Sequence, residues 1–140
     1  MGFGELITQY DSVDGVIDSD KFPIECKESD RASVLVHFDE WISKKDALAR
    51  LEEMGYEAAQ AIELAAFGIE YPFEQLKFPI LALGSLYKVK SHIYEAVYLY
   101  RAEGVRQREI GTVQLPDSWL NGDELNPTIR FLATREINNK

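Results

Sequence analysis

The sequence predicts an α+β fold in which an early pair of helices packs on a late antiparallel sheet of about four strands. Apolar residues recur at helical spacing between residues 43 and 68. From residue 80 onward, β-branched and aromatic residues alternate with polar ones in runs that follow one another closely, which is typical of antiparallel strands. The chain has 140 residues, the length of a single domain. We expect the helices to cover one face of the sheet.

Residues 1–33 predict an irregular acidic arm or a weak hairpin. This segment is rich in Asp, Ser and Gly, and Asp14-Gly15 is a turn signal between two short apolar stretches. The β-branched run at residues 32–38 then predicts a short strand.

The two predicted helices follow this strand. Ser43, with Asp46 three residues later, resembles a capping box and marks the start of the first helix. Gly55 stands where a glycine just beyond the last turn would end it. The second helix is predicted over residues 58–67 and is closed by Gly68. Because the linker is short, the two helices should form a compact hairpin or corner.

The sheet is predicted from four later segments. They are residues 80–89, 93–102, 109–115 and 128–137. Gly84 either kinks the first of these strands or divides it in two. The last two strands are separated by a long connection, residues 115–127, which contains an Asn-Gly turn signal.

The charge of the chain is acidic and unevenly spread. The net charge is −9, and residues 1–40 contain ten acids and three bases. A nucleic-acid-binding surface needs a clustered basic patch, so we expect no nucleic-acid partner. The acidic segment either steers a basic protein partner or serves only solubility.

The sequence also carries information about location. Its N-terminus lacks the basic and apolar regions of a signal peptide, and the apolar run at residues 78–84 is too short to cross a bilayer. Cys26 is the single cysteine, so no internal disulfide can form. We expect a cytoplasmic protein that does not bind membranes, and the sequence leaves its oligomeric state open.

No catalytic motif is recognisable in the chain. The two histidines, His37 and His92, belong to no H-E-x-x-H pattern. Cys26 lies close to Glu25 and Glu28, whose negative charges disfavour a thiolate. We therefore expect no catalytic residue, no metal and no cofactor.

The candidate binding residues are mainly aromatic. They are three tyrosines on one face of a predicted strand, the adjacent arginine and a tryptophan in the long connection: Tyr94, Tyr98, Tyr100, Arg101 and Trp119. These residue types are typical of interface anchors. The opposite face of the strand carries Val97 and Leu99, which suit a core. The tyrosines should therefore lie either on an exposed binding surface or, partly buried, in a core that covers both faces.

Two stretches carry a resemblance to known proteins. Residues 42–85, with a helix ending in a Gly-aromatic pair, a second helix, Tyr-Pro and a Phe-Pro-Ile strand closing on Leu-Gly-Ser, resemble a family of bacterial proteins without an assigned activity. The final "RFLATRE", residues 130–136, is similar to the end of such proteins. The order of elements also resembles C-type-lectin-like domains, although the chain lacks their disulfides and a clear calcium-ligand cluster. The resemblance implies an architecture and no activity.

Besides a mainly structural role as a self-associating subunit, two functional hypotheses follow from these patterns. The first is a non-enzymatic module that binds another protein. In one form of this hypothesis the module is a small acidic inhibitor of a basic target. The alternative is a small-molecule-binding protein or an enzyme with a pocket between helices and sheet, lined by His37, His92, Tyr94 and Arg101.

Overall fold

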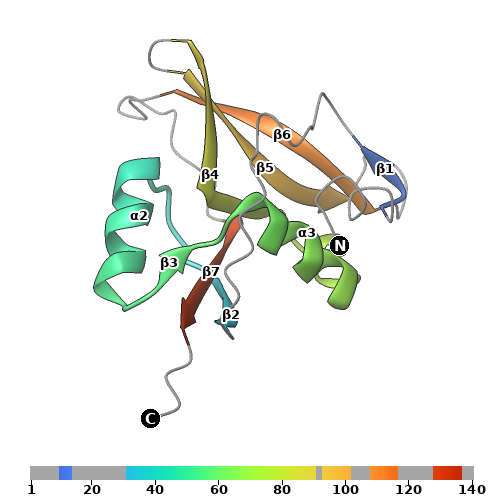
Figure 1. Ribbon diagram of the computed structural model, residues 1–140, viewed down its shortest axis with the longest axis horizontal. Helices are drawn as coiled ribbons and strands as arrows, with labels where there is room; N and C mark the ends of the chain where they lie inside the picture. Colours follow the sequence, from blue (N-terminus) through green and yellow to red (C-terminus); the bar gives the residue numbers. More distant parts are fainter. Residues whose placement is uncertain (1–9, 14–30, 91–92, 102–107, 117–127, 137–140) are drawn as a thin grey trace.

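The computed structural model describes residues 10–13, 31–90, 93–101, 108–116 and 128–136, which form helices on one mixed sheet (Figure 1). The helical elements are α2 (Lys44–Glu53), α3 (Ala61–Glu70) and the short 3-10 turn η1 (Glu74–Leu76). The strands are β1 (Ser12–Val13), β2 (Arg31–Val36), β3 (Glu57–Ala58), β4 (Ile80–Lys90), β5 (Ile93–Arg101), β6 (Arg108–Pro116) and β7 (Arg130–Glu136).

The sheet is larger than the predicted four strands, and it is not purely antiparallel. Its described strands follow the order β1-β6-β5-β4-β7-β2, and β3 also pairs with β7. The β4–β5–β6 meander is antiparallel, as predicted, whereas β1 pairs with β6 and β4 with β7 in parallel. The α+β class is therefore confirmed, and the all-antiparallel sheet was wrong because β7 inserts between β4 and β2, which are distant in sequence.

Helix α2 begins and ends where the local signals placed it. The Ser43 side chain accepts a hydrogen bond from the Asp46 backbone N–H at 3.1 Å, which makes it the N-cap. Beyond the helix, Gly55 has a φ of 82°, a left-handed conformation that glycine adopts without strain. These contacts join residues a few positions apart, so the sequence predicted them correctly.

Helix α3 lies three residues later than predicted. Residues 57–58 pair with β7 as strand β3, and the helix then begins at Ala61. Gly68 does not end the helix but lies buried within it, where an added Cβ would overlap the Tyr10 hydroxyl. A glycine at this position lets helix α3 and Tyr10 approach each other closely. The prediction that Gly68 ends the helix was therefore wrong.

The two helices cover opposite faces of the sheet and do not form the predicted hairpin. In the first core cluster, α3 packs on one side of the strands, against Ile80, Val97 and Leu99. In the second, Ala47 of α2 packs with Ala96 and others on the other side. Strand β3 lies between the helices in the chain and pairs with β7, which separates them (Figure 1). Side chains alternate across strands, so both faces are buried in the first part of β4, residues 80–83, and in the middle of β5, residues 96–97.

A kink at Gly84 lets strand β4 leave β7 and make room for β3. The pairing of β4 with β5 shifts register between Ala82 and Leu86. At this point the Gly84 N–H donates to the Ala59 carbonyl at 2.8 Å, and the Ala59 N–H donates to the Leu132 carbonyl at 2.9 Å. The predicted kink is confirmed.

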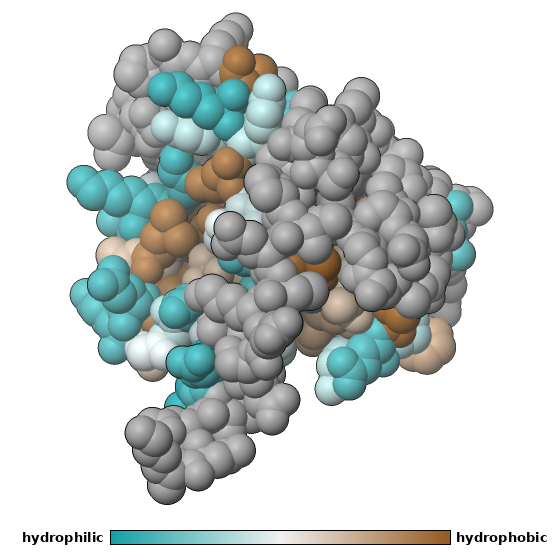
Figure 2. Space-filling view, in the orientation of Figure 1, coloured by the Kyte–Doolittle hydropathy of each residue, from teal (hydrophilic) through white to brown (hydrophobic). Residues whose placement is uncertain are grey.

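The surface of the described residues is mixed in polarity. Trp41 and Met54, near the two ends of α2, are 57% and 47% exposed. In the space-filling view hydrophobic side chains reach the surface over this region among hydrophilic neighbours (Figure 2). No helix among the described residues is long and apolar enough to span a membrane.

Candidate functional site

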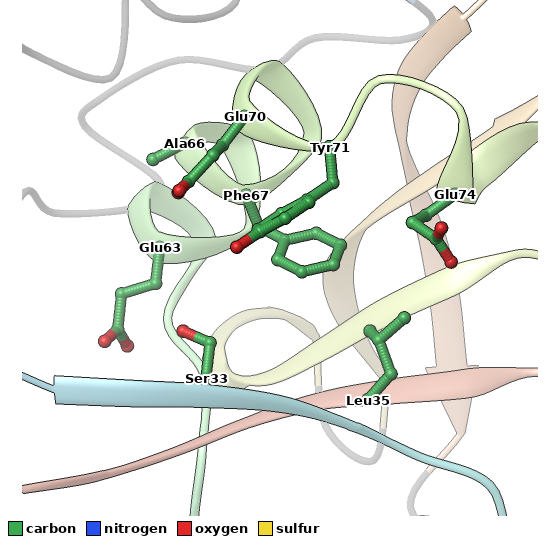
Figure 3. A pocket seen from close by; sticks show the side chains of 8 residues that line it. All are labelled: Ser33, Leu35, Glu63, Ala66, Phe67, Glu70, Tyr71 and Glu74. Carbon is green, nitrogen blue, oxygen red and sulfur yellow. The ribbon is translucent and has the colours of Figure 1, made fainter.

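A groove of about 690 Å³ lies between strand β2 and helix α3 (Figure 3). Strand β2 forms one edge of the sheet of described strands. The described residues that line the groove are two from β2, four from α3 and two from the following turn: Ser33, Leu35, Glu63, Ala66, Phe67, Glu70, Tyr71 and Glu74. Its volume is that of a site that holds a drug-sized molecule or a short peptide segment.

The periodicity of each element directs these side chains into the groove. Ser33 and Leu35 are two residues apart on β2 and share one face. Glu63, Phe67 and Glu70 follow the spacing of one face of α3. Figure 3 shows the Phe67 and Tyr71 rings between the carboxylates of Glu63 and Glu70 and that of Glu74.

The three carboxylates of the groove differ in how they are held. Glu63 accepts a hydrogen bond at 2.9 Å from the Gln60 backbone N–H and so closes the capping box of α3. Glu74 forms a partly exposed ion pair with Lys77 at 3.0 Å. Glu70 is exposed and makes no hydrogen bond or ion pair with another described residue. Of the three carboxylates, that of Glu70 is thus the one that no other described residue holds.

The aromatic wall of the groove consists of Phe67 and Tyr71. Their ring centroids lie 5.0 Å apart with the planes tilted by 40°. Tyr71, which lines the groove, is 49% exposed. Large aromatic side chains exposed beside a groove mark interaction surfaces more often than isolated surface apolar residues do.

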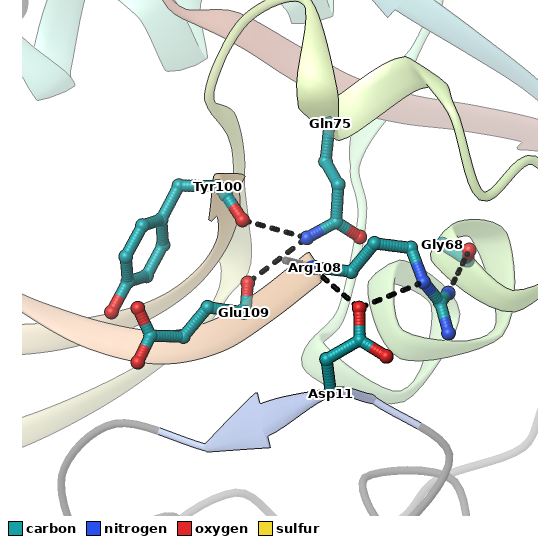
Figure 4. Close-up of polar contacts among 6 residues, drawn as sticks. All are labelled: Asp11, Gly68, Gln75, Tyr100, Arg108 and Glu109. Atoms are coloured by element: carbon teal, nitrogen blue, oxygen red, sulfur yellow. Dashed lines mark hydrogen bonds and ion pairs between the residues drawn. The ribbon is translucent and has the colours of Figure 1, made fainter. Parts of the chain in front are cut away.

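The turn that carries Tyr71 and Glu74 is held by the buried amide of Gln75 (Figure 4). Its Nε2 donates to the carbonyl of Tyr100 at 2.8 Å and to that of Glu109 at 3.0 Å. These carbonyls belong to β5 and β6, so the turn is fixed to the sheet. The Gln75 Oε1 atom is buried and has no hydrogen-bond partner among the described residues.

The C-terminal part of α3 is held by Arg108. Its guanidinium donates to the Gly68 carbonyl at 3.1 Å and lies 4.0 Å from the Asp11 carboxylate (Figure 4). The same carboxylate accepts the Arg108 backbone N–H at 2.8 Å. A cation at the C-terminus of a helix is favourable because it meets unpaired carbonyls. The C-terminal end of the groove's helical wall and the turn that follows it are thus anchored.

The predicted tyrosine face is half-buried and does not form an open strip. Tyr98 and Tyr100 stack with ring centroids 4.2 Å apart, and Tyr98 packs against the second core cluster. The Lys44 ammonium lies 4.1 Å from the centroid of the Tyr94 ring. Arg101 is exposed, and with Tyr100 it lines a smaller cavity of about 220 Å³ beside η1. Trp119 lies outside the described residues.

The residues named for the alternative pocket are not brought together where the structure describes them. Tyr94 and Arg101 are seven positions apart on β5, which separates them by roughly 23 Å. His37 is exposed beyond the end of β2, where it lies 3.7 Å from Asp39, and His92 lies outside the described residues.

The sequence analysis did not identify the residues of the groove as candidate site residues. Glu63 and Glu70 are seven residues apart, two helical turns, and this spacing on one face was a readable signal. The opposite wall carried no such signal, because nothing local shows that β2 would lie beside α3.

Comparisons with known proteins add no functional assignment. No protein-family model, curated protein sequence or solved structure matched this chain significantly. Among the described residues, no group of three or more His, Cys, Asp or Glu side chains could hold a metal ion.

Proposed function

We propose that this protein is a non-enzymatic binding module that holds a basic segment of another protein in the groove between β2 and α3. The observation that carries the proposal is the composition of the groove. Three carboxylates and two aromatic rings line it, and its described lining contains no Lys or Arg. A cationic segment would gain ion pairs with the carboxylates and apolar contact with the rings.

The charge of the whole chain supports the same partner. The net charge is −9, and residues 1–40 contain ten acids and three bases. A field of this sign accelerates encounter with a basic protein, and the acceleration falls as salt screens it. The groove would then supply the short-range contacts that fix the partner in place.

The geometry of the groove suits a protein segment. It is bordered by an edge strand and lined by two aromatic side chains, Phe67 and the half-exposed Tyr71. Aromatic anchors beside a groove are typical of protein–protein recognition. The Gln75 amide fixes the turn between α3 and β4, so the rings are held in place before the partner arrives.

Affinity capture with matched charge variants tests the proposal. The groove variant is Glu70→Lys with Glu74→Lys, and the control is Glu52→Lys with Glu53→Lys on the exposed face of α2. Both variants change the net charge equally. We expect one protein from the native host's lysate, identified by mass spectrometry, to bind the wild type and the control and to be lost from the groove variant. Equal capture by all three proteins would contradict the proposal.

A further inference from the structure

We infer that the group held in the groove is an arginine side chain of the partner, lying against the Tyr71 ring with its guanidinium paired to Glu70. This inference rests on the proposed function and narrows it to one side chain. It follows from the arrangement of a half-exposed ring beside a carboxylate that forms no ion pair with another described residue.

The ring and the carboxylate are neighbours in the chain and both face solvent. Tyr71 is 49% exposed, and Glu70, which precedes it, is exposed and makes no ion pair with another described residue. Figure 3 shows the Tyr71 ring and the Glu70 carboxylate on the same side of α3. A planar guanidinium can stack on a ring and still direct its N–H groups in its own plane toward a carboxylate.

Arginine suits this pair better than lysine does. A lysine ammonium is a compact and strongly hydrated charge, so it loses more hydration when it leaves water for an aromatic surface. A guanidinium is weakly hydrated and binds both oxygens of a carboxylate in a forked geometry. With equal charge, arginine should therefore bind more tightly.

The same combination already occurs within this molecule. The Arg50 guanidinium lies 5.5 Å from the centroid of the Phe38 ring and pairs with Glu40 at 2.6 Å. Thus one arginine of this chain already combines a ring and a carboxylate on an exposed surface. In the groove, Tyr71 and Glu70 supply the ring and the carboxylate, and the partner supplies the arginine.

The other groove residues can support this side chain. Leu35 offers an apolar surface to the methylene stem of an arginine, as amphipathic side chains require. Glu63 is oriented by the Gln60 N–H, so it adds a fixed negative charge at the same opening. Both features favour one long cationic side chain over a short one.

Peptides of equal charge test the inference. The probes are acetylated peptides of nine arginines, nine lysines or nine citrullines, titrated by calorimetry into the full-length protein at about 150 mM salt. We expect the arginine peptide to bind about tenfold more tightly than the lysine peptide. The citrulline peptide keeps the planar group without its charge, and we expect it not to bind.

Three variants locate the preference. Tyr71→Leu keeps an apolar side chain and should reduce the arginine advantage to about threefold or less while leaving lysine binding unchanged. Glu70→Gln should weaken both cationic peptides, and Glu52→Gln on α2 should weaken neither. Circular dichroism would show that each variant is folded, and Glu70→Gln, which changes an exposed side chain, keeps the test valid if Tyr71→Leu does not fold.

Three results would overturn the inference. If arginine and lysine peptides bind equally and Glu70→Gln weakens both, the groove binds cations without a preference, and the proposed function stands. If the arginine preference persists in Tyr71→Leu, the ring is not its source. If neither groove variant changes any binding, the proposed function fails together with the inference.

Discussion

The hydroxyl of Tyr10 donates a hydrogen bond of 2.6 Å to the carbonyl of Ala65, 55 positions along the chain. Tyr10 is 6% exposed and belongs to the first core cluster with the apolar face of α3. The Arg108 guanidinium lies 5.2 Å from the centroid of its ring. Tyr10, just before β1, is therefore part of the core that supports the groove.

Replacing Gly68 by alanine should destabilise the protein by about 1–2 kcal/mol. In an ordinary helix this substitution stabilises by up to about 1 kcal/mol, because alanine is the better helix former. Here the added Cβ would overlap the Tyr10 hydroxyl and a methyl of Leu99. Urea unfolding of both proteins measures the difference.

A double-mutant cycle identifies the cause of that loss. Tyr10→Phe removes the hydroxyl that the Gly68→Ala methyl group would meet, so the two changes together should cost less than the sum of their separate costs. Strict additivity would show that Tyr10 is not the obstacle.

Alkaline pH should weaken the fold through Tyr10. Burial raises the pKa of Tyr10 well above its usual value, and the nearby charge of Arg108 opposes this only in part. The unfolded chain releases this proton near pH 10, whereas the folded chain still holds it. The contribution of Tyr10 to the free energy of unfolding is therefore fully present below about pH 10. It falls as the pH rises toward the folded-state pKa.

The measurement is the free energy of unfolding at about pH 9 and about pH 11. Tyr10→Phe should be less stable than the wild type at the lower pH, because it lacks the hydrogen bond to Ala65. Between the lower and the higher pH, however, it should lose less stability than the wild type. An equal loss in both proteins would show that Tyr10 does not cause the alkaline decline.

Gly84→Ala should cost more than Gly68→Ala, about 3 kcal/mol or above. The atoms that its Cβ would meet are the carbonyl oxygens of Ala58 and Ala59, which belong to the backbone and cannot rotate away. Thermal or urea unfolding measures both variants. A suitable control is Gly55→Ala, whose Cβ would meet nothing within 4 Å and whose cost should come from its positive φ alone. A smaller loss for Gly84 than for Gly68 would contradict this prediction.

Gln75→Met should destabilise the protein by about 1–3 kcal/mol. The change keeps the length of the side chain but leaves the carbonyls of Tyr100 and Glu109 without the amide donor. Because this amide also fixes the turn that bears Tyr71, peptide binding to the groove should weaken as well. Lys77→Met, which breaks only an exposed ion pair, should change stability by about 1 kcal/mol or less.

Local signals in the sequence were reliable where the contact they describe is short in range. Ser43 and Gly55 marked the two ends of α2 correctly, and Gly84 marked the kink in β4. The same kind of reasoning failed at Gly68, since the reason for that glycine is a tyrosine 58 positions earlier. A glycine alone does not show whether it ends a helix or admits a neighbour.

Only one wall of the acidic groove, the one formed by α3, could be predicted from the sequence. The spacing of Glu63 and Glu70 along α3 was readable as one polar helix face. Its other wall depends on the pairing of β2 with β7, which joins Arg31 to Glu136 across most of the chain. Pairing at that separation depends on the packing of the whole sheet and not on the propensity of either segment.

By itself, the sequence determined the α+β class, helix α2 and the β4–β5–β6 meander, because capping, periodicity and short turns act between near neighbours. Only the tertiary structure decided that β7 enters between β4 and β2, and that the helices cover opposite faces of the sheet. It also decided that the tyrosines of β5 are half-buried while Glu70 and Tyr71 face a groove. These outcomes follow from burying apolar surface on both faces of one sheet, which depends on every strand together.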